Sequence, residues 1–120
     1  IPLRLVGSEM CIRDSCFFAT KVSLLNEYKR LADTLGIDWR TAMHGFAADG
    51  RVGDSHMNVP GPDGKMGFGG ACFPKDINAL ISLAAEQKVD MHVLKAAWKT
   101  NLEVRPEADW NEIGSRAVSE

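Results

Sequence analysis

The sequence has little of what several classes of protein require. Its 14 basic and 16 acidic residues give a formal charge of −2, so no basic face for nucleic acid is predicted. No run of 18 apolar residues occurs, and we therefore expect no membrane-spanning helix. The three cysteines form no CxxC pair, which predicts free thiols and a reducing, cytoplasmic location instead of a disulfide framework or a zinc ribbon. With 45% apolar and 25% charged residues, the composition is that of a soluble globular domain.

The histidines also lack the spacing of a metal site. His44, His56 and His92 form neither an HxxxH nor an HExxH pair, and no local pair of carboxylates completes a site around them. We expect these three side chains at the surface or in packing contacts, and we predict no metal centre.

Both ends of the sequence differ from its middle. Residues 1–15 follow neither a helical nor a strand period and look like a foreign tag or an assembly scar, so we leave them out of the predicted fold. They also lack the layout of a secretory signal. Residues 117–120 stop inside a helical pattern without a glycine or proline. We therefore expect one domain in residues 16–120, cut at both ends.

Apolar residues spaced by three and four predict helices in the first half of this domain. The first helix runs over residues 17–35, with Gly36 as its C-terminal cap. Asp38 is well placed to cap a second, short helix over residues 39–48. The side chains that this short helix is expected to bury are Trp39, Met43 and Phe46.

The second half shows the same spacing. A third helix is predicted to begin near Pro74, a fourth to span residues 91–104, and a last one to start at Asp109, after the break at Pro106. No stretch alternates apolar and polar residues long enough to predict a strand, so the expected fold is all-α. In the third helix we expect the inward side chains to be Ile77, Leu80, Ile81, Leu83 and Ala84.

A glycine-rich segment separates the second and third predicted helices. Residues 45–70 hold eight of the eleven glycines, and loops of this length inside a domain are usually functional or disordered. Two phosphate-loop interpretations fail, because GxGxxG would need a preceding strand and Gly64-Lys65 is followed by Met66 instead of Ser or Thr. From the glycines alone, a flexible loop is the favoured interpretation.

Cys72 lies between the last of these glycines and the third predicted helix. Pro74 suits the first position of that helix, whose unpaired N–H groups would then point back toward the cysteine. The helix dipole and Lys75 both favour the thiolate, which is the nucleophilic form. Asp76 falls about one turn along the same face, where it could orient water. A lone cysteine is more often a small buried hydrophobe, and only the combination of these neighbours favours catalysis.

Three segments carry a resemblance to a known family. Residues 67–76, GFGGACFPKD, resemble the active-site segment of the UDP-glucose/GDP-mannose dehydrogenase family. Residues 17–22 together with Asn26-Glu27 are similar to the start of the central helix of that family, and residues 49–53 to its DxRIG-type segment. The resemblance implies an all-α central dimerisation domain, like the C-terminal domain of 6-phosphogluconate dehydrogenase, with a long glycine-rich active-site loop. It also implies an NAD-binding Rossmann domain before this region and a nucleotide-binding domain after it.

The resemblance further implies a reaction and roles for individual residues. The family oxidises C6 of a nucleotide sugar from alcohol to carboxylate with two NAD molecules, through a thiohemiacetal and a thioester on a cysteine. By motif match Cys72 is that nucleophile, Asp76 is the acid that activates or orients water, and Lys75 lies against the cofactor. Arg51 is expected to reach the substrate site of the partner subunit. The backbone expected to lie along the sugar nucleotide is that of Gly67, Phe68 and Gly69.

Two further places in the family pattern differ here. The family has a lysine and an asparagine, four residues apart, for proton transfer and oxyanion stabilisation, and these places fall at Cys11 and Ser15. His56 stands where the family often has an aromatic residue, and no role is assigned to it.

The resulting hypothesis is a UDP-glucose 6-dehydrogenase-like enzyme that forms UDP-glucuronate and dimerises through a continuous helix over residues 16–36. A GDP-mannose enzyme and a non-catalytic helical dimerisation module are the alternatives. The isolated chain is expected to be inactive, with NAD bound mainly by a domain that it lacks.

Overall fold

The computed structural model describes residues 6–113, and the side chains of residues 12–111. Its elements are α1 (Val6–Leu35), α2 (Trp39–Ala47), α3 (Cys72–Glu86), α4 (His92–Val104) and the 3-10 helix η2 (Asp109–Ile113). No strand occurs in these described residues, so the predicted all-α architecture is confirmed. Within the same residues, no helix combines the length and the hydrophobicity that crossing a membrane would require.

The long helix α1 begins earlier than the sequence pattern predicts. It starts at Val6 and continues without a break through residue 16 to Leu35, so its 30 residues extend for about 45 Å. Residues 6–15 thus belong to the helix although we left them out of the predicted fold, and Ile12 packs against the core. The foreign origin of residues 1–15 stays a prediction.

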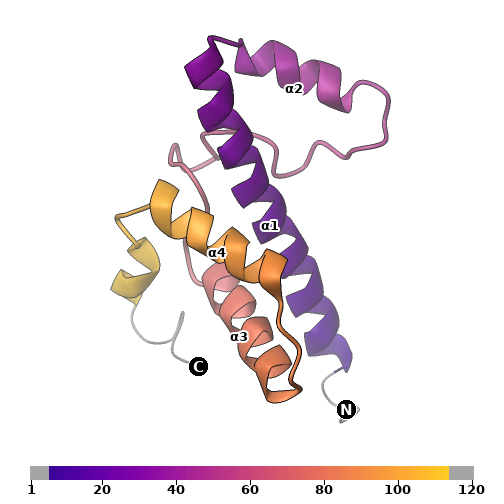
Figure 1. Ribbon diagram of the computed structural model, residues 1–120, viewed down its shortest axis with the longest axis vertical. Helices are drawn as coiled ribbons and strands as arrows, with labels where there is room; N and C mark the ends of the chain where they lie inside the picture. The colour runs from indigo at the N-terminus through magenta and orange to yellow at the C-terminus, as the bar shows by residue number, and fades with distance from the viewer. Residues whose placement is uncertain (1–5, 114–120) are drawn as a thin grey trace.

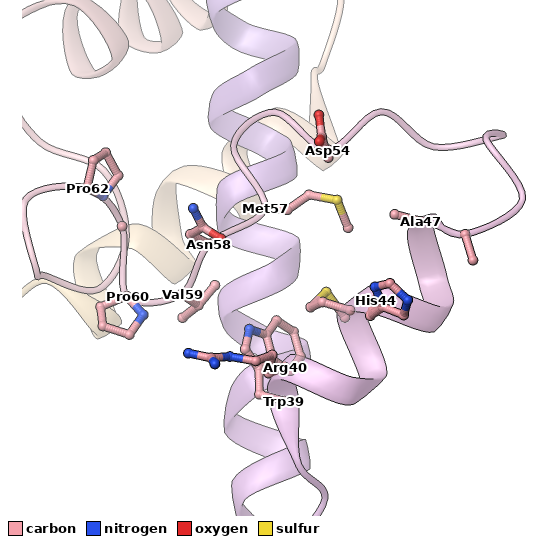
Figure 2. A pocket seen from close by; sticks show the side chains of 13 residues that line it. Trp39, Arg40, His44, Ala47, Asp54, Met57, Asn58, Val59, Pro60 and Pro62 are labelled. Carbon is pink, nitrogen blue, oxygen red and sulfur yellow. The ribbon is translucent and has the colours of Figure 1, made fainter.

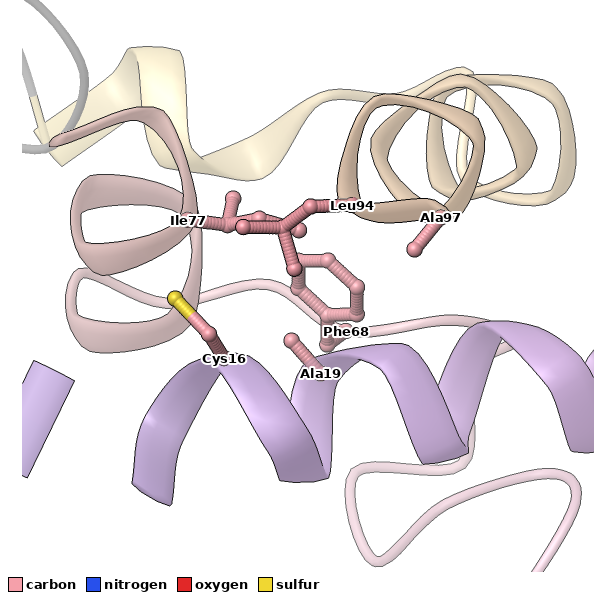
Figure 3. Close-up of a cluster of buried hydrophobic side chains, with 6 residues drawn as sticks. All are labelled: Cys16, Ala19, Phe68, Ile77, Leu94 and Ala97. Carbon is pink, nitrogen blue, oxygen red and sulfur yellow. The ribbon is translucent and has the colours of Figure 1, made fainter. Parts of the chain in front are cut away.

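The main hydrophobic core forms where α3 and α4 pack against α1 (Figure 1). The three helices and the loop before α3 each contribute to it, as Figure 3 shows. Its buried side chains are Cys16 and Ala19 from α1, Phe68 from the loop, Ile77 from α3, and Leu94 and Ala97 from α4. Because the core includes Phe68, the loop that leads to Cys72 is part of the packed structure.

Hydrogen bonds donated by side chains also join α4 to α1. The buried Ser23 hydroxyl donates to the Ala97 carbonyl at 2.7 Å, and Thr100 Oγ1 donates to Glu27 Oε1 at 2.9 Å. These contacts are separate from the loop before α3. The α1–α4 packing therefore has its own polar contacts.

A second, smaller cluster lies at the C-terminal end of α1, where α2 and the long loop meet it (Figure 1). Its buried members are Leu25, Met57 and Val59, with Trp39 and Met43 of α2 partly buried against them. The predicted burial of Phe46 is wrong, because this side chain is 44% exposed and lines a surface hollow beside α1. The hollow lies between Phe46 and residues of α1 such as Leu24 and Tyr28, so the two helices do not close over this side chain.

One inward position predicted for α3 is also wrong. Leu83 is 39% exposed, whereas Ile77 and Ala84 are buried as expected. Successive helical residues are about 100° apart, so Leu83 lies on the flank of the buried face that contains Ala84. A spacing of three residues from Leu80 alone predicts that Leu83 lies on the buried face.

The C-terminal part of the described chain is held by aromatic packing. Trp110 of η2 is almost fully buried, and its ring lies 5.1 Å from that of Trp98 on α4. Trp98 in turn packs on the main core. This packing places η2 close to the end of α4 and next to the glycine-rich loop.

Candidate active site

Cys72 is the first residue of α3 and is a free, exposed cysteine. Helix α3 begins two residues before the predicted start at Pro74, which is buried within the first turn. Proline is tolerated there because the first four N–H groups of a helix have no intrahelical acceptor. The position of Cys72 at a helix N-terminus is therefore as expected, although the exact start is not.

Asp76 lies one helical turn after Cys72 and is buried. Lys75 Nζ is 3.6 Å from Asp76 Oδ1, so the two predicted site residues form an ion pair. The Asp76 carbonyl also accepts a hydrogen bond from Cys16 Sγ of α1 at 3.4 Å. The predicted acid is thus held at the α1–α3 contact, with its charge balanced by Lys75.

The glycine-rich turn before Cys72 passes very close to other parts of the chain. A Cβ on Gly67 would overlap Asn101 Oδ1 and lie 2.9 Å from Val104 Cγ2, and Gly67 also has a φ of +69°. A Cβ on Gly69 would lie 2.5 Å from Arg105 Nη2. Only glycine fits such positions without displacing the neighbouring side chain. Packing within the protein is therefore sufficient to explain both glycines.

Three buried polar side chains hold this turn: Asn26 from α1, Asn101 from α4 and Arg105 immediately after α4. We call these three residues the loop clamp. The Gly67 N–H donates to Asn26 Oδ1 at 3.0 Å. Asn101 binds both main-chain groups of Phe68, accepting from its N–H at 2.7 Å and donating to its carbonyl at 2.9 Å. The Phe68 main chain is thus already paired inside the protein, and its predicted contact with substrate stays a prediction.

Arg105 joins the loop to η2. Its guanidinium donates to Asp109 through Nε and Nη2, both at 2.9 Å, and to Asp63 Oδ2 at 2.7 Å. A further bond of 3.3 Å runs from Nη1 to the Met66 carbonyl. Hydrogen bonds from Arg105 lower the pKa of both Asp63 and Asp109 below the usual aspartate value. A buried charge with this many partners is satisfied in place.

A cavity of about 440 Å³ lies beside the glycine-rich turn. His56 has a φ of +59°, and its ring stacks on Phe18 with 4.3 Å between centroids. Cys72 itself does not line the cavity, but the next residue, Phe73, does. Residues around the cavity include His56, Gly67, Phe68, Gly69, Phe73 and Arg105. All three residues predicted to lie along the sugar nucleotide are therefore found at one hollow.

A larger cavity lies elsewhere and contains none of the predicted site residues. It measures about 700 Å³ and is formed between α2 and residues 54–62, with Trp39, Arg40 and His44 on the α2 side (Figure 2). We place the candidate site at the smaller cavity, because that one is next to Cys72 in the chain.

Arg51 is the predicted site residue that lies apart from the others. Its side chain is 87% exposed and pairs with Asp49, with 2.6 Å between Nη2 and Oδ2. It lines a different hollow, of about 360 Å³, together with Phe17 and Tyr28 of α1. The structure of one chain therefore does not bring Arg51 into the glycine-loop cavity, and its role at a partner's site stays a prediction.

The loop clamp was missed by the sequence reasoning, although a signal for it existed. Asn101 follows Leu94 and Ala97 at helical spacing, so an amide stands on the apolar face of α4. Asn26 likewise lies on the apolar face of α1, seven residues after the buried Ala19. A buried amide on an apolar face needs a partner, and here the partner is the loop backbone.

No group of three or more His, Cys, Asp or Glu side chains within the described chain is placed to hold a metal ion. The two places where the family has a lysine and an asparagine lie on α1 here. Ser15 is partly buried on α1, whereas the side chain of Cys11 lies outside the described ones.

The two described cysteines are expected to differ strongly in reactivity. Burial raises the pKa of Cys16 to about 11, and the charge of Asp76 adds to the shift. At pH 8 only about one Cys16 thiol in a thousand is then ionised, while Cys72 is exposed. Timed alkylation with iodoacetamide, followed by peptide mapping, should label Cys72 at least about a hundredfold faster than Cys16. Similar rates in the folded chain would contradict this description, and unfolded chain in urea serves as the control for equal labelling.

Comparison with known proteins gives a family for the chain. Residues 9–103 match the model of the central domain of the UDP-glucose/GDP-mannose dehydrogenase family. The chain is 35% identical over 114 residues to a UDP-glucose 6-dehydrogenase of Rickettsia bellii, covering 86% of this chain and 25% of that protein. It is 40% identical over 90 residues to one of Rickettsia prowazekii, covering 75% and 19%. For one of Pseudomonas aeruginosa the identity is 38% over 87 residues, covering 72% and 18%.

The family-model match includes most of α1, the glycine-rich loop and the cysteine segment within one continuous region. The chain spans about a quarter of the length of the curated relatives it matches, or less. A family model that covers residues 9–103 of 120 accounts for most of the sequence. The chain therefore belongs to the UDP-glucose/GDP-mannose dehydrogenase family, to whose central domain it corresponds.

Proposed function

We propose that this chain is the catalytic central domain of an NAD-dependent enzyme that oxidises C6 of UDP-glucose, giving UDP-glucuronate. The observation that carries the proposal is the free, exposed Cys72 at the first residue of α3, immediately after a glycine turn that lines a 440 Å³ cavity. The relatives that carry the name UDP-glucose 6-dehydrogenase support UDP-glucose as the sugar nucleotide.

The proposed chemistry passes through covalent bonds to the Cys72 sulfur. The first oxidation removes a hydride from C6 and a proton from its hydroxyl group, leaving an aldehyde. The thiolate adds to the aldehyde carbon and the aldehyde oxygen takes up a proton, which gives a thiohemiacetal. This intermediate then loses a second hydride and a proton to become a thioester. Water hydrolyses the thioester, which releases the carboxylate and returns the thiolate. Covalent capture retains the aldehyde and divides a difficult conversion into easier steps.

Asp76 is proposed to act in the hydrolytic step. Its carboxylate lies one turn along α3 from Cys72, which suits a group that orients or activates the attacking water. The Lys75 ammonium lies 3.6 Å from Asp76 Oδ1, so a cation accompanies the proposed acid. Losing such a group typically costs about 10²–10⁴-fold in rate.

NAD supplies the hydride acceptor when bound, one molecule for each oxidation. The residues described here fit only the edge of such a site. Residues 6–113 contain no strand, so they lack the strand–glycine loop–helix unit that cradles a dinucleotide pyrophosphate. Lys75 has a half-exposed side chain on α3, which is compatible with a contact to the cofactor. We therefore assign cofactor binding mainly to a domain outside this chain.

A homodimer through α1 is also part of the proposal. Five large side chains of α1 are exposed although they follow helical spacing along one stripe. They are Phe17, Leu24, Tyr28, Leu31 and Leu35. A two-fold contact would bury this stripe against its own copy, and it would bring Arg51, which lines a hollow beside the stripe, toward the partner.

Free thiols support a reducing compartment, and we propose the cytoplasm.

The dimer prediction can be tested on the chain itself. Sedimentation equilibrium at micromolar concentration should give a dimer, because an exposed apolar stripe of this length favours association. Leu31→Glu should shift the protein toward monomer by placing a charge in the middle of the stripe. Val89→Glu, at an equally exposed apolar residue between α3 and α4, is the matched control and should remain dimeric. A clean monomer with its helical circular dichroism intact would contradict the proposal.

Two alternatives make different predictions. A GDP-mannose enzyme would use the same cysteine and cavity, because the described site residues belong to the sugar end of the substrate. A non-catalytic association module is favoured only by the exposed stripe on α1. The product of the complete reading frame should release two NADH for each UDP-glucose and ignore GDP-mannose, whereas the isolated chain should show no turnover. Turnover with GDP-mannose alone, or none with either sugar nucleotide, would contradict the proposed function.

A further inference from the structure

Contacts within α3 do not fix the conformation of its first residue, Cys72. Cys72 is the first residue of the helix, and helix ends fray unless their free N–H groups are capped. The capping residue here is Ala71, which makes no side-chain hydrogen bond to the first turn. Packing of Pro74 and Ile77 fixes the axis of α3, but it leaves the conformation at Cys72 dependent on the segment that leads into it.

That segment is held from α4. Asn101 is fully buried and pairs with both main-chain groups of Phe68, four residues before Cys72. Only Gly69, Gly70 and Ala71 separate the paired residue from the cysteine. Gly70 has a φ of +73° and no atom within 4 Å of its missing side chain, whereas Gly69 lies close to Arg105, so the contacts of this short connection come from Arg105 and from the first turn of α3.

Arg105 holds the beginning of the same segment. Its guanidinium donates to Asp63 and to the Met66 carbonyl in the loop, and to Asp109 in η2. Arg105 therefore links two residues of the loop to η2. Arg105 is 2% exposed and lines the cavity beside the turn. Since α4 is joined to α1 independently by Ser23, these contacts are not needed to dock the helix.

We propose that Asn101 and Arg105 are positioning residues that fix Cys72 by fixing residues 63–68 against α4 and η2. This inference rests on the proposed role of Cys72 as the nucleophile, whose approach to C6 must be held within a fraction of an ångström to be productive. The two side chains act through the loop backbone. When these side chains are removed, the thiol is still present, but its position varies more.

The test uses the 120-residue chain with backbone NMR. Asn101→Ala should speed hydrogen exchange of the Phe68 amide by about five- to tenfold, because the amide loses its acceptor. The order parameter of the Cys72 amide should fall from the rigid range of about 0.85 toward about 0.6. Arg105→Lys keeps the charge but not the planar fork, and it should cause a smaller fall at Cys72. Asp63→Asn, at a half-exposed site, removes the negative charge from one Arg105 partner while keeping an acceptor oxygen, and it is expected to fold normally and to cause a small fall at Cys72.

Ser23→Ala is the matched control, because it removes one buried α1–α4 hydrogen bond without touching the loop. It should lower the melting temperature while leaving the Phe68 exchange rate and the Cys72 order parameter close to those of the unmodified chain. If the Asn101 and Arg105 variants change the Cys72 amide no more than Ser23→Ala does, the proposal is wrong. If Asn101→Ala unfolds the chain, an unchanged Cys72 amide in both Arg105→Lys and Asp63→Asn overturns it.

These readouts do not depend on catalysis. The proposed function fails if the complete enzyme forms acid without Cys72, whatever the NMR result. The positioning role fails on the NMR result alone, even if Cys72 proves to be the nucleophile.

Discussion

Serine at position 72 is expected to reduce formation of the acid by the complete enzyme by about three orders of magnitude or more. The hydroxyl is nearly as small as the thiol, but it is a far weaker nucleophile at neutral pH. The first hydride transfer needs no thiol, so a single oxidation to the aldehyde can persist. The measurement is the rate of acid formation, followed separately from the rate of NADH release.

Cys16→Ala is the control for this prediction. Cys16 is the other described cysteine and lies buried in the core, with a pKa of about 11. Its replacement should cost some stability and leave acid formation within about twofold of the unmodified enzyme, since it touches no reacting group. Near-normal acid formation by Cys72→Ser would show that Cys72 is only a surface thiol.

Gly67→Ala is expected to lower the free energy of unfolding more than other small substitutions in the glycine-rich loop. Its φ of +69° costs a side-chain residue about 1–2 kcal/mol. The added methyl group would also overlap Asn101 Oδ1, and forcing such an atom into packed surroundings costs about a further 1–3 kcal/mol. The total loss in the free energy of unfolding should therefore be about 2–5 kcal/mol, measured by urea denaturation.

Gly64→Ala separates these two causes. Gly64 has a φ of +77° but no atom within 4 Å of its missing side chain. It should therefore show the backbone cost of about 1–2 kcal/mol without the overlap. Equal losses for the two variants would mean that the close approach of Asn101 to Gly67 does not constrain the loop.

The helices could be predicted because their information is local. Apolar side chains recur every three or four residues in α1, α3 and α4, and Gly36 adopts the positive φ expected of a residue that ends a helix. Exposure was less predictable. Phe46 fits the apolar pattern of α2, yet it is exposed because it borders an open hollow beside α1 that no side chain fills.

In the candidate site, too, the local features could be predicted from the sequence and the long-range contacts could not. Cys72 could be placed at a helix start from its neighbours in the sequence, because proline and the glycines act locally. The partners of the loop clamp could not, since these contacts join residues 33 to 42 positions apart, although the amides on apolar helix faces gave a signal that partners exist. The glycines alone indicate a flexible loop, and the family resemblance implies that the loop backbone lies along the sugar nucleotide. In the structure, Gly67 and Gly69 make room for Asn101 and Arg105. A sequence shows where a side chain is missing but not which atoms occupy that space.

The covalent role of Cys72 is tested most directly by mass spectrometry of the complete Asp76→Asn enzyme. This substitution should slow thioester hydrolysis by about 10²–10⁴-fold, so that the acyl-enzyme accumulates during turnover. After mixing with UDP-glucose and NAD and rapid quenching in acid, the peptide that contains Cys72 should carry the mass of the UDP-glucuronyl group. An unmodified Cys72 peptide while acid is still being formed would contradict the account.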